Sequence, residues 1–321
     1  MILCCGEALI DMISEKYPKG QDGFMPHAGG AVFNTAIALG RLGVPTGILS
    51  GISQDQFGAF LLNKLQGSHV DTSFVVRADR PTTLAFVSLA DGHASYSFFD
   101  ENSAGRMLSS SDFPNVPSEA QALYFGGISL SVEPAAEAFV GLMVAQSKLR
   151  AIVVDPNIRP EFIRDQQGYR ARLATIFKHA DIVKVSDEDL DWIYPEAASQ
   201  TEKAHRILRQ GAALVILTRG KRGACAYFAG GEEVNTPAQL VDVVDTVGAG
   251  DTFNAGVLAD LAMSGRLTKS GIRQLSASDM HSALLFGAKV AAVTVSRAGA
   301  NPPWLSELSK GSGTVPPPQP K

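Results

Sequence analysis

The residues with the clearest chemical potential lie around position 250. An apolar lead-in over residues 242–247 runs into Gly248, Ala249, Gly250 and Asp251, and a helical pattern follows. The backbone N–H groups of the first three can converge on an anion, because unpaired amides and the helix dipole favour negative charge at a helix N-terminus. Asp251 stands at the same turn and can take a proton from an attacking hydroxyl. The segment predicts a phosphate cradle with a built-in base; the alternative is an ordinary turn with Asp251 as its N-cap.

A second candidate region lies near the N-terminus, where Gly29 and Gly30 precede Asn34. Glycines allow the backbone to approach a small polyol closely. Asn34 falls one turn into the helix that we expect next, and its amide can hydrogen-bond sugar hydroxyls. A tight turn is the competing interpretation of the glycine pair.

Short apolar runs alternate with helical stretches and must position these residues. The runs are Ile2–Cys5, Thr46–Gly51, Ala122–Phe125, Ile152–Asp155, Ile182–Val185 and Leu214–Thr218. Buried runs of this kind predict an α/β fold with a largely parallel sheet flanked by helices. Functional groups of such folds gather at the carboxyl ends of the strands. Four polar residues lie at or just past these ends: Asp155, Ser186, Thr218 and Asp245.

Residues 83–99 show a different pattern, since two β-rich runs flank Asp91-Gly92, a dipeptide that closes hairpins. We expect this segment to be antiparallel. After Trp304 the chain ends in a Pro/Gly-rich stretch, residues 310–321, which predicts a flexible tail.

Bulk properties favour an enzyme that acts on small molecules. A formal net charge of −4 offers no basic surface for nucleic acid or anionic membranes. The three cysteines include the adjacent pair Cys4 and Cys5 and form no disulfide framework, which is typical of a reducing cytoplasm. We also find no signal peptide pattern and no apolar run near the ~20 residues that a membrane span needs. The sequence thus predicts a cytoplasmic protein without nucleic-acid or membrane partners.

Both glycine motifs, in this order, resemble the two signatures of the ribokinase-like (PfkB) carbohydrate kinases. Between them stand three more segments in the family's order: Asp155-Pro-Asn157-Ile-Arg159, Lys184-Val-Ser186-Asp-Glu188-Asp189 and Thr218-Arg-Gly220-Lys-Arg-Gly223. The resemblance covers roughly residues 1–305 and implies a kinase domain over 1–309. Its implied fold is ribokinase-like: a mainly parallel central sheet flanked by helices, with a small β lid from about residues 12–28 and 70–106.

The resemblance also implies ATP-dependent phosphorylation of a sugar hydroxyl, with Asp251 as the base and the amides of Gly248, Ala249 and Gly250 holding the phosphoryl group. Positioning and charge stabilisation carry most of such a transfer. The residues implied to line the nucleotide are Lys184, Ser186, Thr218, Gly220 and Gly223. Lys184 can equally be a solvated lysine at a strand end. Mg²⁺ would arrive with ATP and keep several waters, and either Glu188 or Asp189 can hold that water shell.

For the sugar, the positions that match the family are Asp11, Gly29, Gly30, Asn34 and Asp251. Asp11 has an alternative as a turn residue, and Arg159 is either a ligand contact or part of a structural ion pair. A late loop resembles the family's monovalent-cation site, where backbone carbonyls bind K⁺: Asp245, Val247, Thr294, Arg297 and Gly299. The resemblance further implies a homodimer.

One departure from the family concerns the acceptor. Many relatives that act on acidic or ketose sugars carry a lid arginine where this chain has Asp100, in the segment Phe98-Phe-Asp100-Glu-Asn-Ser-Ala-Gly-Arg106. A carboxylate facing the ligand would repel an acidic sugar and accept hydrogen bonds from neutral hydroxyls. This disfavours 2-keto-3-deoxygluconate and favours D-fructose, in keeping with a resemblance to bacterial fructokinases. The alternative is that Asp100 points to solvent or caps a turn.

Three other functions are alternatives to a fructose-specific kinase. Another neutral acceptor, such as ribose, another hexose or a nucleoside, fits the same motifs. A non-catalytic sugar sensor would have no chemical need for Asp251. A dinucleotide-dependent oxidoreductase would need Gly-x-Gly-x-x-Gly after the first strand, where the chain has Gly6 followed by Glu7 and Ala8.

Overall fold

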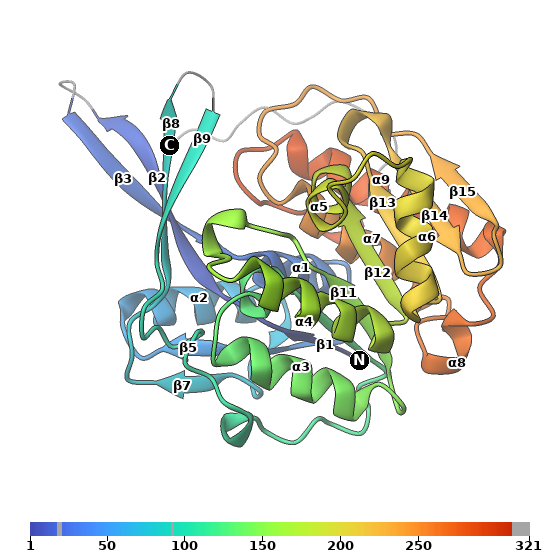
Figure 1. The fold of residues 1–321 in the computed structure, drawn as a ribbon. Helices are drawn as coiled ribbons and strands as arrows, with labels where there is room; N and C mark the ends of the chain where they lie inside the picture. Colours follow the sequence, from blue (N-terminus) through green and yellow to red (C-terminus); the bar gives the residue numbers. More distant parts are fainter. Residues whose placement is uncertain (18–20, 91–92, 310–321) are drawn as a thin grey trace.

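The computed structural model describes residues 1–17, 21–90 and 93–309, so the Asp91-Gly92 turn and the 310–321 tail lie outside it. Its main feature is a nine-stranded sheet in the order β15-β14-β13-β12-β11-β10-β1-β4-β6 (Figure 1). The strands are β1 (Ile2–Cys5), β4 (Thr46–Leu49), β6 (Val70–Asp71), β10 (Ala122–Gly126), β11 (Ala151–Asp155), β12 (Ile182–Ser186), β13 (Leu214–Thr218), β14 (Ala224–Phe228) and β15 (Glu233–Thr236). Pairing is parallel from β6 to β13 and antiparallel at β14 and β15. The predicted α/β fold with a largely parallel sheet is confirmed.

Helices cover both faces of this sheet because successive strand residues point to opposite sides. In β1, Ile2 and Cys4 join a core with α1 (Ala31–Arg41), α2 (Gln56–Gln66), α7 (Ala249–Met263) and α9 (Ala277–Val295). Leu3 and Cys5 join a second core with α3 (Ala135–Gln146), α4 (Gln166–His179), α5 (Asp187–Ile193) and α6 (Gln200–Gln210). The short helices are α8 (Lys269–Ile272), α10 (Leu305–Ser309), η1 (Ser110–Asp112), η2 (Gly127–Leu130), η3 (Pro160–Phe162) and η4 (Gly220–Arg222). No helix among the described residues has the length and apolar character to cross a bilayer.

Helices α7 and α9 touch through glycine. A Cβ on Gly256 of α7 would lie 2.7 Å from the Cα of Gly287 on α9, and a Cβ on Gly287 would lie 2.8 Å from the carbonyl oxygen of Phe253. Distances this short leave no room for a side chain, so the two backbones pack directly on each other. The N-terminus of α7 is therefore held by a close helix pair.

A separate four-stranded sheet, the lid, projects from the body (Figure 1). It is formed by β2 (Leu9–Tyr17), β3 (Gln21–Gly29), β8 (Leu84–Ala90) and β9 (His93–Phe99), in the order β3-β2-β8-β9. The predicted antiparallel hairpin over residues 83–99 is present as β8 and β9. The lid sheet is narrower than expected, because β6 belongs to the main sheet and β7 (Val76–Ala78) pairs with β5 (Gly51–Ser53).

The two faces of the lid differ. Asp11 pairs with Ala85, and Ala85 pairs with Phe98, so these three residues share one face. Their neighbours Phe86 and Phe99 point to the other face, where Phe86 forms edge-on ring contacts with Phe24 and with Phe99. One face thus carries a predicted sugar contact and the other an aromatic cluster.

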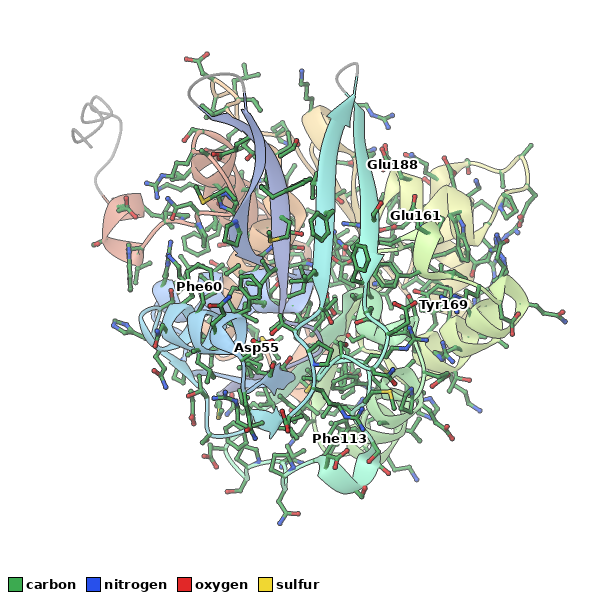
Figure 2. The ribbon with its side chains drawn as sticks, turned by 90° about the vertical axis from the view of Figure 1, so that its left-hand side faces the viewer. Asp55, Phe60, Phe113, Glu161, Tyr169 and Glu188 are labelled. Carbon is green, nitrogen blue, oxygen red and sulfur yellow. The ribbon has the colours of Figure 1, made fainter. Side chains whose placement is uncertain are left out.

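The foot of the lid is tied to the body at Asp55, which Figure 2 labels. Its carboxylate caps α2 by accepting from the Gly58 amide at 2.7 Å. It also accepts from the amide and the hydroxyl of Thr82, at 3.0 and 2.8 Å, just before β8 begins. These bonds fix the start of the lid hairpin while its far end projects.

Candidate active site

The general base predicted at residue 251 is buried in the first turn of α7. Gly248 precedes the helix with a left-handed backbone, φ 75°, and only 7 % of Asp251 is exposed. The side-chain amide of Asn34, on α1, donates to Oδ2 of Asp251 at 2.9 Å. The two signature motifs, 217 residues apart, therefore meet in one hydrogen bond.

Asp251 has the acid–base character that proton abstraction near neutral pH requires. Burial raises its pKa to about 7, the charge of Asp155 adds to this, and Asn34, Lys184 and Arg159 oppose it. A carboxylate with this pKa can take a proton near pH 7 and release it again. The amide of Ala249 donates to the carbonyl of Thr246 at 3.2 Å, so Gly248 and Gly250 are the better donors for an anion in the predicted cradle.

Beneath Asp251 lies a buried polar layer that we call the floor, made of Asp155, Lys184, Asn254 and Tyr124. Oδ2 of Asp155 accepts from Lys184 Nζ at 2.9 Å and from the Asn254 amide at 2.7 Å. The Asn254 amide also lies 3.2 Å from the Tyr124 hydroxyl. The floor thus links β10, β11 and β12 to helix α7.

Lys184 is 3 % exposed, which rules out the solvated alternative considered above. Burial by itself would lower its pKa, but the carboxylates of Asp155, Asp189 and Asp251 outweigh burial and raise it. The lysine is therefore charged. A Cβ on Gly250 would lie 3.3 Å from its Nζ, so the lysine sits directly against the predicted phosphate cradle.

Asn254 and Tyr124 were not predicted, and Asp155 was noted only for its place at a strand end and in a family segment, without a role in the site. Asn254 follows Asp251 by three residues on α7, and that spacing places both side chains on one face of a helix. This signal was available in the sequence. The partners of Asp155 come from other strands and from α7, and no local pattern identifies them.

On the sugar side, Asp11 and Arg159 converge from the lid and from the loop after β11. Burial raises the pKa of Asp11 to about 6, and the charge of Arg159 counteracts this. The charge of Arg159 also lowers the pKa of Asp251. The guanidinium group donates to the carbonyl of Ile158 at 3.0 Å. A Cβ on Gly29 would lie 2.0 Å from Oδ2 of Asp11, so a side chain there would displace the Asp11 carboxylate.

The turn that presents Gly30 is supported by Glu7, a residue that was not predicted. The Glu7 carboxylate, 7 % exposed, accepts from the Ala31 amide at 3.0 Å and from the Ser129 hydroxyl at 2.8 Å. Burial raises its pKa. Glu7 thereby anchors the N-terminus of α1, and with it Asn34, to the end of β1.

Asp100 differs from the other predicted sugar contacts. Its Oδ1 accepts from the hydroxyls of Thr83 at 2.7 Å and Ser103 at 2.8 Å, and its Oδ2 lies 3.8 Å from Arg106. Only 4 % of the residue is exposed. None of these contacts reaches Asp11 or the other predicted sugar residues. The carboxylate is buried directly after β9, where Thr83, Asp100 and Ser103 form what we call the lid hinge. It therefore does not point into solvent.

A hollow of about 500 Å³ lies next to Asp100, between the end of β9 and the start of α4. It is lined by Phe98, Arg106, Glu161 and Tyr169 among others, and of the predicted sugar contacts it includes Asp100 alone. Figure 2 shows Glu161 and Tyr169 on the β9 side of the lid. The hollow therefore adjoins the lid hinge and does not contain the predicted base.

The predicted nucleotide residues gather at one edge of the sheet. Ser186 and Thr218 are register partners at the ends of β12 and β13. Gly220 and Gly223 have left-handed backbones, with φ 52° and 83°, and a Cβ on Gly223 would meet the carbonyl oxygen of Thr236 at 2.1 Å. The Ser186 hydroxyl accepts from the Asp189 amide at 3.0 Å and so caps α5.

The two acidic candidates near this edge differ in their bonding. Asp189 accepts from the Ile158 amide at 2.9 Å and from the Ser186 amide at 3.3 Å. Burial and the charge of Asp155 raise its pKa. Glu188 is exposed, as Figure 2 shows near the top of the molecule.

The predicted cation loop is organised by Asp245. Its two carboxylate oxygens accept from the Val247 amide at 3.0 Å and from the Gly299 amide at 2.8 Å. Thr294 is buried in the last turn of α9, and Arg297 pairs with Glu307 at 2.6 Å. The loop reaches the phosphate cradle, because a Cβ on Gly248 would lie 2.7 Å from the Cβ of Ala300.

Comparisons with known proteins agree with this geometry. The family described as "pfkB family carbohydrate kinase" matches residues 1–307. A fructokinase from Rhizobium leguminosarum bv. trifolii is 48 % identical over 275 residues, which are 86 % of this chain and 84 % of the relative. The crystal structure of a fructokinase with bound ATP from Xylella fastidiosa superposes with a TM-score of 0.88 and 31 % identity, covering 96 % of each chain.

A further solved structure is a double mutant of a fructokinase from Vibrio cholerae O395, in a form with bound fructose, ADP and potassium ion. It is 25 % identical, has a TM-score of 0.81 and covers 93 % of each chain. The ribokinase-like fold and the resemblance predicted from the motifs are confirmed. The chain belongs to the pfkB family of carbohydrate kinases.

Proposed function

We propose that this protein is an ATP-dependent fructokinase that transfers the γ-phosphoryl group of ATP to the 6-hydroxyl of D-fructose. The observation that carries the proposal is the placement of Asp251, a buried carboxylate with a pKa of about 7, within the glycine turn that opens α7. Its relatives include a fructokinase at 48 % identity.

In the proposed reaction, Asp251 accepts the proton of the sugar hydroxyl as that oxygen attacks the phosphoryl group. The amides of Gly248 and Gly250 stabilise the negative charge that develops on the phosphoryl oxygens. Asn34 keeps the Asp251 carboxylate in place through the 2.9 Å hydrogen bond. Asp11 and Arg159 orient the remaining hydroxyls, and the lid excludes water that would otherwise hydrolyse ATP.

The nucleotide would lie along Ser186, Thr218, Gly220 and Gly223, with Lys184 against the cradle. Mg²⁺ bound to ATP supplies charge neutralisation between the phosphates. Asp189 already accepts two backbone hydrogen bonds, so Glu188 is the freer carboxylate for the metal's water shell. K⁺ would bind backbone carbonyls of the loop of Asp245, whose carboxylate holds the segments at 247 and 299 next to each other.

D-Fructose is distinguished from other neutral acceptors by direct assay. Coupled ADP release should be measured with fructose, ribose, glucose, adenosine and 2-keto-3-deoxygluconate in parallel. We expect the highest kcat/KM for fructose. A higher kcat/KM for any of the others would replace fructose as the substrate and leave the kinase assignment intact.

We further propose a cytoplasmic homodimer in which the outer faces of two lids pack together. That face exposes Phe24 and Phe99, which are 42 % and 59 % exposed and each contact Phe86. Exposed aromatic clusters of this kind are typical of protein interfaces. Phe99→Glu should give a monomer by light scattering, whereas Leu149→Glu, an exposed position on the body, should not.

A further inference from the structure

The floor contains a buried ion pair between Lys184, which also lies against the proposed phosphate cradle, and Asp155, which has no part in the proposed reaction. Asp155 is fully buried and Lys184 is 3 % exposed, and their charged atoms lie 2.9 Å apart. An isolated buried charge is strongly unfavourable, so such pairs need a well-formed environment. Here the environment is the first two turns of α7: Asn254 donates to Asp155, and Lys184 lies against Gly250.

The pair is also connected to the main chain of Asp251. Thr35 Oγ1 lies 3.3 Å from the carbonyl oxygen of Asp251 and 3.4 Å from the hydroxyl of Tyr124. Tyr124 in turn accepts from Asn254. Thr35 Oγ1 also lies 3.0 Å from the carbonyl oxygen of Ala31, its nearest acceptor. A buried run of polar contacts through Thr35, Tyr124 and Asn254 therefore lies between the backbone of Asp251 and Asp155.

We infer that Asp155 and Lys184 are positioning residues that fix the turn carrying Asp251 and balance each other's charge beneath it. The inference rests on the proposed role of Asp251 as the general base. The charge of Asp155 raises the pKa of Asp251, and the charge of Lys184 lowers it. Removing one charge should therefore change the strength of the base, and removing both should largely restore it.

Other groups also face Asp251 and stay unchanged in this comparison. Arg159 approaches from the loop after β11, and Asn34 donates from α1. The remaining neighbours are Tyr124, whose pKa is raised by burial and by the charges of Asp155 and Asp251, and Asp189, which acts on Lys184. In the part of the chain that the structure describes, the floor pair places opposite charges on the adjacent strands β11 and β12 below the base.

The test is the pH profile of kcat at saturating fructose and ATP. Activity should rise with pH as Asp251 ionises, which gives the wild type an acid limb. Asp155→Asn removes a neighbouring negative charge, so the limb should move to lower pH by about 1 unit. Lys184→Met removes a positive charge, so the limb should move to higher pH by about 1 unit. The double variant should return close to the wild-type position.

Lys203→Met is the matched control. Lys203 is also a buried lysine, paired with Asp191 at 2.6 Å, but it lies on α6. It should leave the acid limb in place. If Lys184→Met does not fold, Lys184→Gln keeps an N–H donor toward Asp155 without the charge and should shift the limb in the same direction.

Each outcome has a separate meaning. A wild-type profile without an acid limb overturns the base role of Asp251, and the inference with it. A normal limb that neither single substitution moves, or that both move the same way, overturns the inference alone. A change confined to the KM for ATP would assign Lys184 to the nucleotide phosphates and overturn its role as a positioning residue.

Discussion

The edge of the main sheet and the lid hold the proposed substrate in different ways. At the sheet edge, Asp251 lies above a floor in which Asp155 and Lys184 are almost completely buried and hydrogen-bonded. In the lid, Asp11 is carried by a thin sheet whose outer face exposes Phe99. If the proposed roles hold, the chemistry has a rigid support, whereas acceptor binding uses a part that we expect to close.

The largest loss of kcat should follow from a substitution at the sheet edge. Asp251→Asn keeps the shape of the side chain but cannot accept the hydroxyl proton. We expect kcat to fall by about 10² to 10⁴-fold, while fructose binding measured by calorimetry persists. Near wild-type turnover in the purified variant would show that Asp251 is not the general base, and the chemistry could then not be assigned to the sheet edge.

A substitution in the lid should separate binding from chemistry. Asp11→Asn replaces a charged acceptor by a neutral one, and we expect the KM for fructose to rise about 10-fold above pH 7 with kcat nearly unchanged. Burial raises the pKa of Asp11 to about 6, so the difference between the two proteins should shrink below that pH. Glu15→Gln, four residues along the same strand and exposed, is the control. A loss confined to kcat would contradict a binding role.

The same Asp251→Asn variant should be more stable than the wild type at neutral pH. The pKa of Asp251 is about 7 in the folded protein against an ordinary value of 3.8, so the native state binds the proton more tightly. Its contribution to stability is fully present below pH 3.8 and is lost as the pH rises through about 7. The gain from removing the charge should be on the order of 1–3 kcal/mol above pH 7.

Chemical denaturation at pH 8 and at pH 4 measures this gain. The stability difference between variant and wild type should be large at pH 8 and small at pH 4. An equal difference at both pH values would show that burial of the charge is not the cause.

The smallest effect concerns motion of the lid. Hydrogen exchange of peptides from residues 83–100 should slow when fructose is added, because closure protects the hairpin. Exchange in β12 should stay the same. Equal protection of the hairpin with and without sugar would argue that the lid is as rigid as the sheet edge.

The sequence predicted most of the fold because short apolar runs can be recognised as buried strands from neighbouring residues alone. It also predicted that Asp251 and Asn34 serve one site, which their hydrogen bond supports. The floor was not predicted, since Asp155 and Asn254 lie 99 residues apart and only the packing of α7 on the sheet joins them. Asp100 illustrates the same limit: its residue type suggested a ligand contact, and its hydrogen bonds at the hinge depend on Thr83 and Ser103.

The glycine contact between α7 and α9 has a mechanical consequence. Because the two backbones are in direct contact at Gly256 and Gly287, a shift of one helix along the other would cause steric clashes. Helix α7 begins at the phosphate cradle, and α9 ends at the loop of Asp245 and Gly299. The two ends are therefore held in a fixed position relative to each other, and we expect a cation bound in the proposed loop to change the position of the turn before Asp251.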